Sequence, residues 1–208
     1  MFIVKFNKSV IVTYLGVIFG CLSMYFAFSK VAFAEVNHIR YSLIFLMLAG
    51  VCDMFDGKIA RMCKRTKQEK EFGIQLDSLA DTVSFICCPV VIMLSLGMDS
   101  IYHIIIYMLF VIAGISRLGY FNTIAELDGP VKYYNGLPVT TTAIIYPVLG
   151  LLHGNINFNA FCNVYIITTL ITAFLFIFKF KVPKLKGVAY YIISILALIL
   201  LILLLVIR

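Results

Sequence analysis

The sequence contains few of the features that mark a soluble or secreted protein. None of its 208 residues is tryptophan, only 13% are charged, and ten acidic residues face 17 Lys and Arg, which leaves a net charge of +7. Mean hydropathy is +1.04 and 62% of the residues are hydrophobic, well above the values of a soluble globular chain. Apolar runs of about 20 residues recur, which is the length needed to cross about 30 Å of hydrocarbon. The composition therefore predicts an integral membrane protein.

The chain also lacks the patterns of a disulfide framework, a zinc site or a nucleophilic triad. Its six cysteines form no C-x-x-C pair and lie in or at the edge of apolar runs, so we interpret them as packing residues. The histidines, His38, His103 and His153, are scattered and form no H-E-x-x-H pattern. No nucleic-acid-binding motif is present. We therefore attribute the basic charge to membrane topology and attraction to anionic lipid, and expect no nucleic-acid partner.

The apolar runs and the breaks between them predict an all-α fold, a polytopic bundle of about seven transmembrane helices in a single domain, 1–208. The predicted spans are residues 10–30, 39–62, 74–97, 101–122, 138–153, 159–179 and 187–207. Residues 1–9 are predicted to form either a short interfacial helix or a frayed terminus. Residues 32–34 mimic a signal-peptide cleavage site, but the preceding run is longer than a signal-peptide core, so we expect the first helix to be retained.

Lysine and arginine are distributed unevenly between the two sides of these spans. With the loop between the second and third spans in the cytoplasm, 14 of the 17 Lys and Arg residues fall on that side. Basic residues accumulate in cytoplasmic loops, so this arrangement places the amino end inside. We expect a multi-pass protein of the cell membrane whose polar loop faces the cytoplasm.

Most of the aspartates fall in one stretch, at the point where two predicted helices meet this loop. They are Asp53, Asp56, Asp77 and Asp81. Spacings of three and four residues stack each pair on one helix face. Gly57 and Ala60 continue the first face, and Gly73 and Ser84 continue the second. Two helices could therefore each present a pair of carboxylates beside small residues.

Clustered carboxylates near a membrane core are costly unless they are paired, bind a metal or face a wet cavity. Hard divalent cations prefer oxygen ligands, and two such ions about 3.5–4 Å apart assist phosphoryl chemistry. Two solvated helix ends would account for the charges, but not for the small residues on the same faces. We predict that the four aspartates bind two Mg²⁺ or Mn²⁺ ions, and Ca²⁺ would also fit.

The pattern Asp53-x-x-Asp56-Gly57-x-x-Ala60-Arg61, followed by Gly73-x-x-x-Asp77-x-x-x-Asp81, resembles the signature of the CDP-alcohol phosphatidyltransferases. All eight signature residues are present, but the connection between the halves, 62–72, is longer than is usual in that family. The resemblance implies transfer of a phosphatidyl group from CDP-diacylglycerol or CDP-archaeol to an alcohol, with release of CMP. It also implies a homodimer in the membrane lipid.

The same resemblance implies roles for individual residues. Contacts to the CDP-lipid are implied for Asp53, Gly57, Ala60, Arg61 and Gly73. Small residues would let a nucleotide approach the helix closely, and an arginine could pair with a phosphate through its planar fork. Asp81, the last aspartate of the signature, is implied as the base that accepts the proton of the attacking alcohol. The same carboxylate could instead serve only as a metal ligand.

Three further features resemble the phosphatidylserine synthases of this family. Ser78 follows the third signature aspartate, where phosphatidylglycerophosphate synthases usually carry proline. The other two are Arg117-Leu118-x-x-Phe121-Asn122 and Asn135-Gly136-Leu137-Pro138, although Tyr120 stands where arginine is usual. The resemblance implies L-serine as the acceptor, with contacts at Arg117, Asn135, Gly136 and Pro138. On spacing alone, the second segment would be an ordinary turn before a helix.

Two alternatives to serine transfer stay open at this point. One is the same chemistry with glycerol 3-phosphate, inositol or choline as the acceptor. The other is an ion or solute transporter that uses the aspartates, which predicts polar residues throughout several spans. Polar residues here gather at one end of the spans, which favours an enzyme at the membrane interface.

Overall fold

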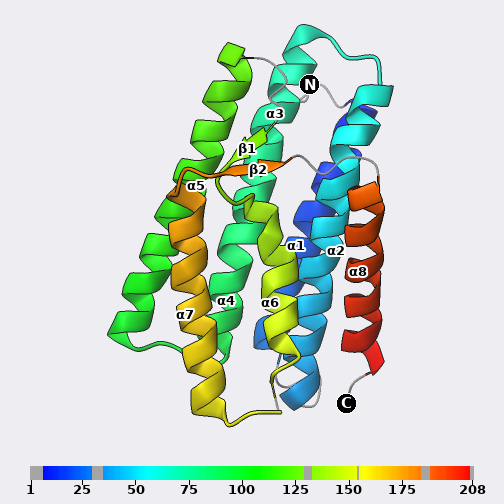
Figure 1. The fold of residues 1–208 in the computed structure, drawn as a ribbon. Coiled ribbons are helices and arrows are strands. Elements are labelled where there is room, and N and C mark those ends of the chain that lie inside the picture. Colours follow the sequence, from blue (N-terminus) through cyan, green and yellow to red (C-terminus); the bar gives the residue numbers. More distant parts are fainter. Residues whose placement is uncertain (1–6, 30–34, 129–132, 154, 184–187, 207–208) are drawn as a thin grey trace, which may run out of the picture.

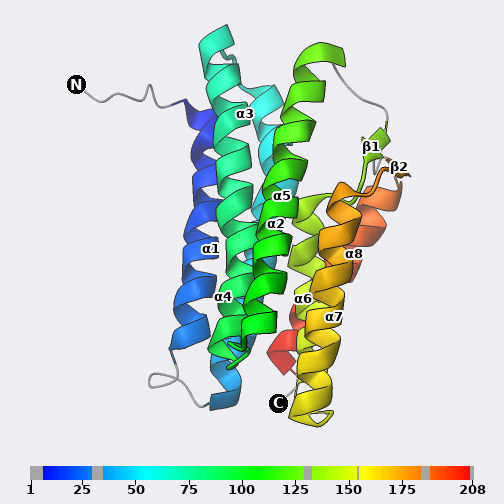
Figure 2. The ribbon, with the colours of Figure 1, turned by 90° about the vertical axis from the view of Figure 1, so that its left-hand side faces the viewer.

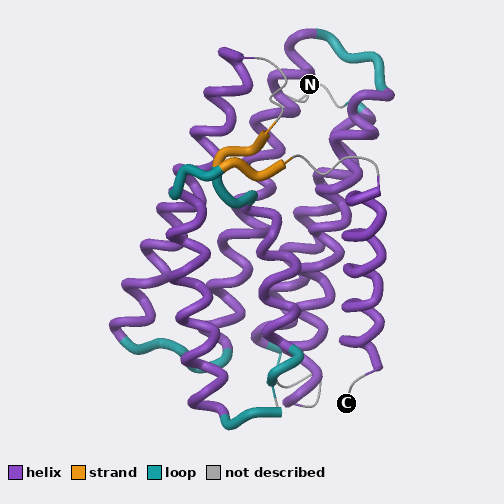
Figure 3. The backbone as a smooth tube through the Cα atoms, viewed as in Figure 1, coloured by secondary structure: helices purple, strands orange, loops and turns teal. Residues whose placement is uncertain are grey.

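The computed structural model describes residues 7–29, 35–128, 133–153, 155–183 and 188–206 (Figure 1). Within these ranges, long helices lie side by side along a common direction, and loops join them at the two ends of the bundle (Figures 1 and 3). The helical elements are the 3-10 turn η1 (Lys8–Val10), α1 (Ile11–Phe28), α2 (Glu35–Met62), α3 (Lys67–Asp81), the π-helix η2 (Thr82–Cys87), α4 (Cys88–Ser95), α5 (Ile101–Asp128), the 3-10 turn η3 (Val139–Thr141), α6 (Thr142–Gly150), α7 (Phe158–Ile177) and α8 (Val188–Val206). The predicted all-α fold is confirmed.

The helices follow the predicted spans closely. In the described ranges, four of them are long and apolar enough to cross a membrane by length and composition: Lys8–Phe28, Lys67–Ser95, Ile101–Thr123 and Phe158–Ile177. Val139–Gly150 and Ile195–Val206 are shorter apolar helices. The protein is therefore a membrane protein, and the total of seven crossings stays a prediction. Most of the predicted interfacial segment 1–9 lies outside the described residues.

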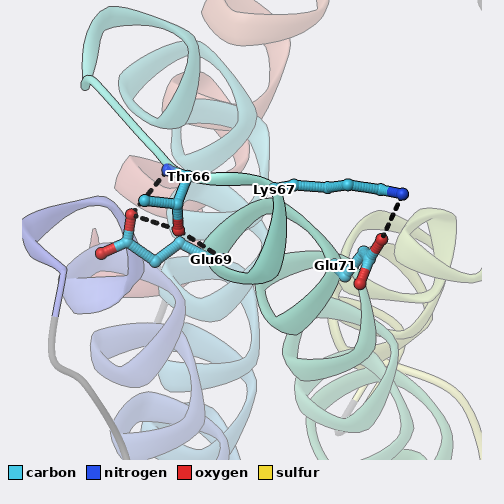
Figure 4. A network of polar contacts seen from close by, with 4 residues as sticks. All are labelled: Thr66, Lys67, Glu69 and Glu71. Carbon is cyan, nitrogen blue, oxygen red and sulfur yellow. Dashed lines mark hydrogen bonds and ion pairs between the residues drawn. The ribbon is translucent and has the colours of Figure 1, made fainter.

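The third helix begins earlier than predicted, which shortens the polar loop. Thr66 is its N-cap: the Thr66 side chain accepts a hydrogen bond from the Glu69 backbone N–H at 3.3 Å, and the Glu69 carboxylate accepts one from the Thr66 N–H at 2.7 Å (Figure 4). Lys67 and Glu71 add an exposed ion pair at 3.9 Å. This reciprocal cap is the capping box, and its T-x-x-E pattern was readable in the sequence. The prediction that the third helix begins at residue 74 was wrong, because this cap starts the helix at Lys67.

Small residues let α1 pack closely against the helices that carry the aspartates. A Cβ on Gly16 would lie 3.4 Å from the Cys52 Cβ of α2, and a Cβ on Gly20 would lie 2.7 Å from the Ser84 Oγ of η2. The Ser84 hydroxyl also donates to the Gly16 carbonyl at 3.4 Å. Close approach at small residues is how membrane helices gain packing energy. Helix α1 thereby holds α2 beside the continuous rod α3–η2–α4 (Figure 2).

Two short strands lie at the end of α7, while α5 extends beyond them (Figures 1 and 3). They are β1 (Tyr133–Asn135) and β2 (Lys181–Pro183), which pair antiparallel with Tyr134 opposite Val182. Gly136 follows with φ of 79°, and its N–H donates to the Phe180 carbonyl at 2.8 Å. The predicted spans left residues 123–137 as a connection; helix α5 extends into it as far as Asp128, and the strand pair joins the end of the connection to the end of α7.

Candidate active site

Helices α2 and α3 bring three of the four predicted carboxylates together. Asp53, Asp56 and Asp77 each offer an oxygen, and these oxygens all lie within 4.8 Å of one another. Asp81 lies one helical turn beyond Asp77 and lines the same small cavity, about 10 Å³ in volume. Asp56 and Asp81 are only 7% and 8% exposed. The two aspartate pairs that the spacing placed on separate helix faces thus face one another.

Thr13 of α1 holds one of these carboxylates. Its Oγ1 donates a hydrogen bond to Asp56 Oδ2 at 3.0 Å, and both groups are buried. The hydroxyl fixes the orientation of the carboxylate from a third helix. Sequence reasoning missed Thr13, because a single threonine in an apolar run carries no recognisable pattern.

The backbone changes its helical type directly after Asp81. The π-helix η2 covers Thr82–Cys87, and the Phe85 carbonyl within it accepts a hydrogen bond from Thr142 Oγ1 of α6 at 2.9 Å. Single π-helical turns inside longer helices are frequent at functional sites. Here the wider turn changes the register between the Asp77–Asp81 face and the α4 face, which packs in the bundle interior. The sequence showed no sign of this turn.

A larger cavity, about 210 Å³, opens beside the aspartates. Its walls come from η1, α1, α2, α3 and the loop between α2 and α3, and the lining residues are Ser9, Val10, Thr13, Asp56, Gly57, Ala60, Arg61, Arg65, Gly73, Ile74 and Asp77. Four of the five predicted CDP-lipid contacts are in this set, and the fifth, Asp53, lines the smaller cavity. We call the larger space the donor cavity. Ser9, Val10, Thr13, Arg65 and Ile74 were not predicted.

The glycines of the donor cavity lie next to arginines. The Arg61 Nη1 atom lies 4.0 Å from the point where a Cβ on Gly57 would be, and the Arg65 Nη1 atom lies 3.4 Å from the corresponding point on Gly73. The prediction was that these glycines leave room for a nucleotide. In this structure the space beside the two glycines borders two guanidinium groups of the wall, and nucleotide binding there stays a prediction.

The predicted serine contacts lie in a separate region, at the joint between α5, β1 and α6. Arg117 is 6% exposed; its Nε donates to the Leu137 carbonyl at 3.0 Å, and its guanidinium lies 5.4 Å from the Phe121 ring centre. Gly136 is in the positive-φ turn, and Pro138 precedes η3 as its N-cap residue. The side chain of Asn135 lies outside the described residues. Of the other three, Arg117, Gly136 and Pro138, none lines either cavity described above.

One hydrogen bond connects the two regions. Asn122 Nδ2 of α5 donates to Ser78 Oγ of α3 at 2.7 Å. Ser78 lies between Asp77 and Asp81, and Asn122 lies five residues after Arg117. Two of the three segments that resemble phosphatidylserine synthases therefore meet in space.

The comparisons with known proteins agree with the signature. Residues 6–207 match the CDP-alcohol phosphatidyltransferase family. A CDP-diacylglycerol–serine O-phosphatidyltransferase of Saccharomyces cerevisiae is 38% identical over 130 residues, which are 56% of this chain and 46% of that protein. An archaetidylserine synthase of Methanothermobacter thermautotrophicus is 35% identical over 107 residues, which are 51% and 44% of the two chains. A Helicobacter pylori protein named as a CDP-diacylglycerol–serine O-phosphatidyltransferase is 26% identical over 149 residues, 68% and 59% of the two chains.

The aligned region thus spans about half the length of the first two of these relatives. The match to the family itself covers almost the whole chain and includes all eight signature residues. The structure brings those residues to two adjoining cavities. The protein belongs to the CDP-alcohol phosphatidyltransferase family.

Proposed function

We propose that this protein transfers the phosphatidyl group of a CDP-lipid, CDP-diacylglycerol or CDP-archaeol, to the hydroxyl of L-serine, with release of CMP. The observation that carries the proposal is the cluster of Asp53, Asp56 and Asp77 at the wall of the donor cavity. The names of the yeast and archaeal relatives support serine as the acceptor. The confinement of the carboxylates to one site favours an enzyme over a transporter.

The aspartate cluster fits a divalent metal. Three carboxylate oxygens from two helices within 4.8 Å of one another form an all-oxygen donor set, which suits a hard cation such as Mg²⁺ or Mn²⁺ and also Ca²⁺. We propose that Asp53, Asp56, Asp77 and Asp81 hold two ions. When bound, such ions neutralise phosphate charge and stabilise the leaving group.

The other residues of the site have roles that follow from their positions. Thr13 keeps the Asp56 carboxylate oriented. Arg61 lies along the donor cavity, where its planar fork can pair with a phosphate oxygen. Asp81 is the proposed base: it accepts the proton of the serine hydroxyl as the new phosphorus–oxygen bond forms, and the bond to CMP breaks.

On the acceptor side, we propose that Arg117 provides the cation for the serine carboxylate, with Asn135, Gly136 and Pro138 shaping the surrounding segment. The hydrogen bond between Asn122 and Ser78 supports a link from this region to the aspartates. Because this region does not line the donor cavity, serine would reach the reaction centre from the α5 side. The proposal includes a homodimer, by analogy with the family.

We also propose that the site faces the cytoplasm, on the strength of the lysine and arginine distribution. A cysteine introduced in place of Lys67, in an otherwise cysteine-free protein, should react with a membrane-impermeant reagent only from the cytoplasmic side. Reaction from the outside would reject this orientation.

The direct test of the activity is an acceptor screen with purified protein, CDP-diacylglycerol and Mg²⁺ or Mn²⁺. We expect CMP release that depends on L-serine, with a phosphatidylserine product identified by mass spectrometry. The D53N variant is the inactive control. Turnover of glycerol 3-phosphate, inositol or choline without turnover of serine would contradict the proposal that serine is the acceptor. The family assignment would be unaffected. Absence of CMP release with every acceptor would contradict the activity itself.

A further inference from the structure

The long connection between the two halves of the signature places a second arginine in the donor cavity. Arg65 lies in the loop between α2 and α3, lines the cavity, and has its Nη1 atom against the Gly73 position. Its Nε is buried and has no hydrogen-bond partner among the residues that the structure describes. A buried donor without a partner destabilises the folded state by about 1–3 kcal/mol. Arg65 Nε could therefore bind a group that a ligand provides.

A second buried polar atom without a partner lies in the wall of the same cavity. Ser9 is 2% exposed, and its Oγ makes no hydrogen bond within the described part of the chain. The backbone N–H of Ser9 is held by the Asn7 side chain at 3.0 Å, so the residue has a defined place in η1. Two such atoms at one cavity indicate a polar ligand that completes their hydrogen bonds.

The segments that carry these two residues are fixed to each other. Asn7 Nδ2 donates to the Lys64 carbonyl at 3.3 Å, which joins the amino-terminal segment to the loop next to Arg65. On the other side of Arg65, the capping box of Thr66 and Glu69 fixes the start of α3 (Figure 4). Arg65 is therefore held between two anchored neighbours and does not extend from a loose loop.

We propose that Arg65 and Ser9 form a nucleotide-binding subsite of the donor cavity, and that the long 62–72 connection is what supplies it. The ligand is the phosphate-bearing nucleotide half of the CDP-lipid, which is also the released CMP, so the inference rests on the proposed function. Arg65 binds the phosphate-bearing side through its planar fork, and the Ser9 hydroxyl binds a second polar group of the nucleotide. Arg61, in the last turn of α2, is then free to bind the diphosphate near the aspartates.

The test is calorimetric titration of CMP into the purified protein with Mg²⁺, together with KM for CDP-diacylglycerol. We expect Arg65→Ala to weaken CMP binding about tenfold or more, as for one hydrogen bond to a charged group, and Ser9→Ala about threefold. KM for CDP-diacylglycerol should rise in parallel while kcat changes little. Arg65→Lys keeps the charge but not the fork, and its affinity should fall between those of the wild type and Arg65→Ala.

Lys64→Ala is the matched control, because it removes a neighbouring exposed charge but keeps the backbone carbonyl that Asn7 binds. It should change CMP affinity by less than about twofold, as expected for an exposed charge. Thermal unfolding of each variant identifies any loss of folding.

The subsite is overturned if Arg65→Ala and Ser9→Ala, both folded, match the wild type in CMP affinity and in KM; water then completes these hydrogen bonds. It is also overturned if Lys64→Ala weakens CMP binding as much as Arg65→Ala, because the effect is then one of general charge. Failure of the proposed function gives a different result: the wild type itself neither binds CMP nor releases it from CDP-diacylglycerol.

Discussion

The donor cavity and the Arg117 joint differ in how their polar groups are used. In the donor cavity, carboxylates and two arginines line open space, and buried polar atoms such as Ser9 Oγ have no partner within the described residues. At the joint, the polar groups are engaged by the backbone: Arg117 Nε binds the Leu137 carbonyl, and the Gly136 N–H binds the Phe180 carbonyl. We take the unpartnered groups of the donor cavity as proposed ligand contacts, whereas the hydrogen-bonded groups at the joint hold the backbone in place.

Because of this contrast, we expect substitutions of the aspartates and substitutions of the predicted serine contacts to have different effects. A substitution in the aspartate cluster should alter chemistry and leave the bundle folded, because few protein contacts depend on those carboxylates. A substitution at the joint should alter folding as well, because the backbone relies on it. The predictions below are arranged to separate these outcomes, beginning with the largest effect.

Asp53→Asn should reduce turnover by about three orders of magnitude, because one lost carboxylate removes several kcal/mol of metal-assisted charge stabilisation. CMP release measures the turnover, and titration of Mn²⁺ by calorimetry measures the metal affinity, which should fall as well. A strong chelator should abolish wild-type activity, and added Mg²⁺ or Mn²⁺ should restore it.

Asp99→Asn is the matched control, because Asp99 is an exposed aspartate in the loop between α4 and α5. It should keep full activity. Full wild-type activity in the presence of the chelator would contradict the proposal that the reaction needs a bound metal.

Asp81→Asn and Asp56→Asn should separate the base from the ligands. If Asp81 is mainly the base, its variant should lose about two orders of magnitude in kcat, typical of a lost general base, while it keeps much of its affinity for the CDP-lipid. Asp56→Asn should lose both, because it is part of the three-carboxylate cluster. Equal losses of CDP-lipid affinity in the two variants would assign Asp81 as a ligand only.

Much of this site could be predicted from the sequence, because helical periodicity translates spacing directly into geometry. Aspartates three and four residues apart share a helix face, and a short connection places the two helices side by side, so a cluster of Asp53, Asp56 and Asp77 was expected. Thr13 and Ser9 could not be predicted in the same way. They reach the site from α1 and η1 through tertiary packing at Gly16 and Gly20, and local pattern does not encode such packing.

At the Arg117 joint, by contrast, the sequence pattern could not distinguish between two interpretations. The Asn135–Pro138 pattern predicted either a substrate contact or a turn, and both are compatible with a glycine that needs positive φ. Only the structure shows that a Cβ on Gly136 would lie 3.1 Å from the Phe176 carbonyl oxygen. The pairing of β1 with β2 could not be foreseen either, because three-residue strands carry too little alternation to be recognised.

Thr13→Val should weaken Mn²⁺ binding and turnover by about tenfold, in the range typical of lost outer-shell contacts to metal ligands. Valine has nearly the shape of threonine but cannot donate to Asp56, so the effect isolates the 3.0 Å hydrogen bond. Thr13→Ser keeps the hydroxyl and should retain most of the activity. Unchanged metal affinity in Thr13→Val would show that the Asp56 carboxylate needs no support from α1.

Arg117→Ala has an expected effect about equal to that of Thr13→Val, and it tests the difference between the donor cavity and the joint. If Arg117 binds the serine carboxylate, KM for serine should rise about tenfold, as for one charge-assisted hydrogen bond, and KM for CDP-diacylglycerol should change less. Gly136→Ala is the matched disturbance of the same joint, because it forces a side chain into positive φ without removing a charge. It should lower the free energy of unfolding by about 1–2 kcal/mol and raise KM for serine less than Arg117→Ala does, because the cation is kept. If Arg117→Ala loses stability but not serine affinity, the arginine supports the Leu137 backbone alone, and another group must provide the cation for the serine carboxylate.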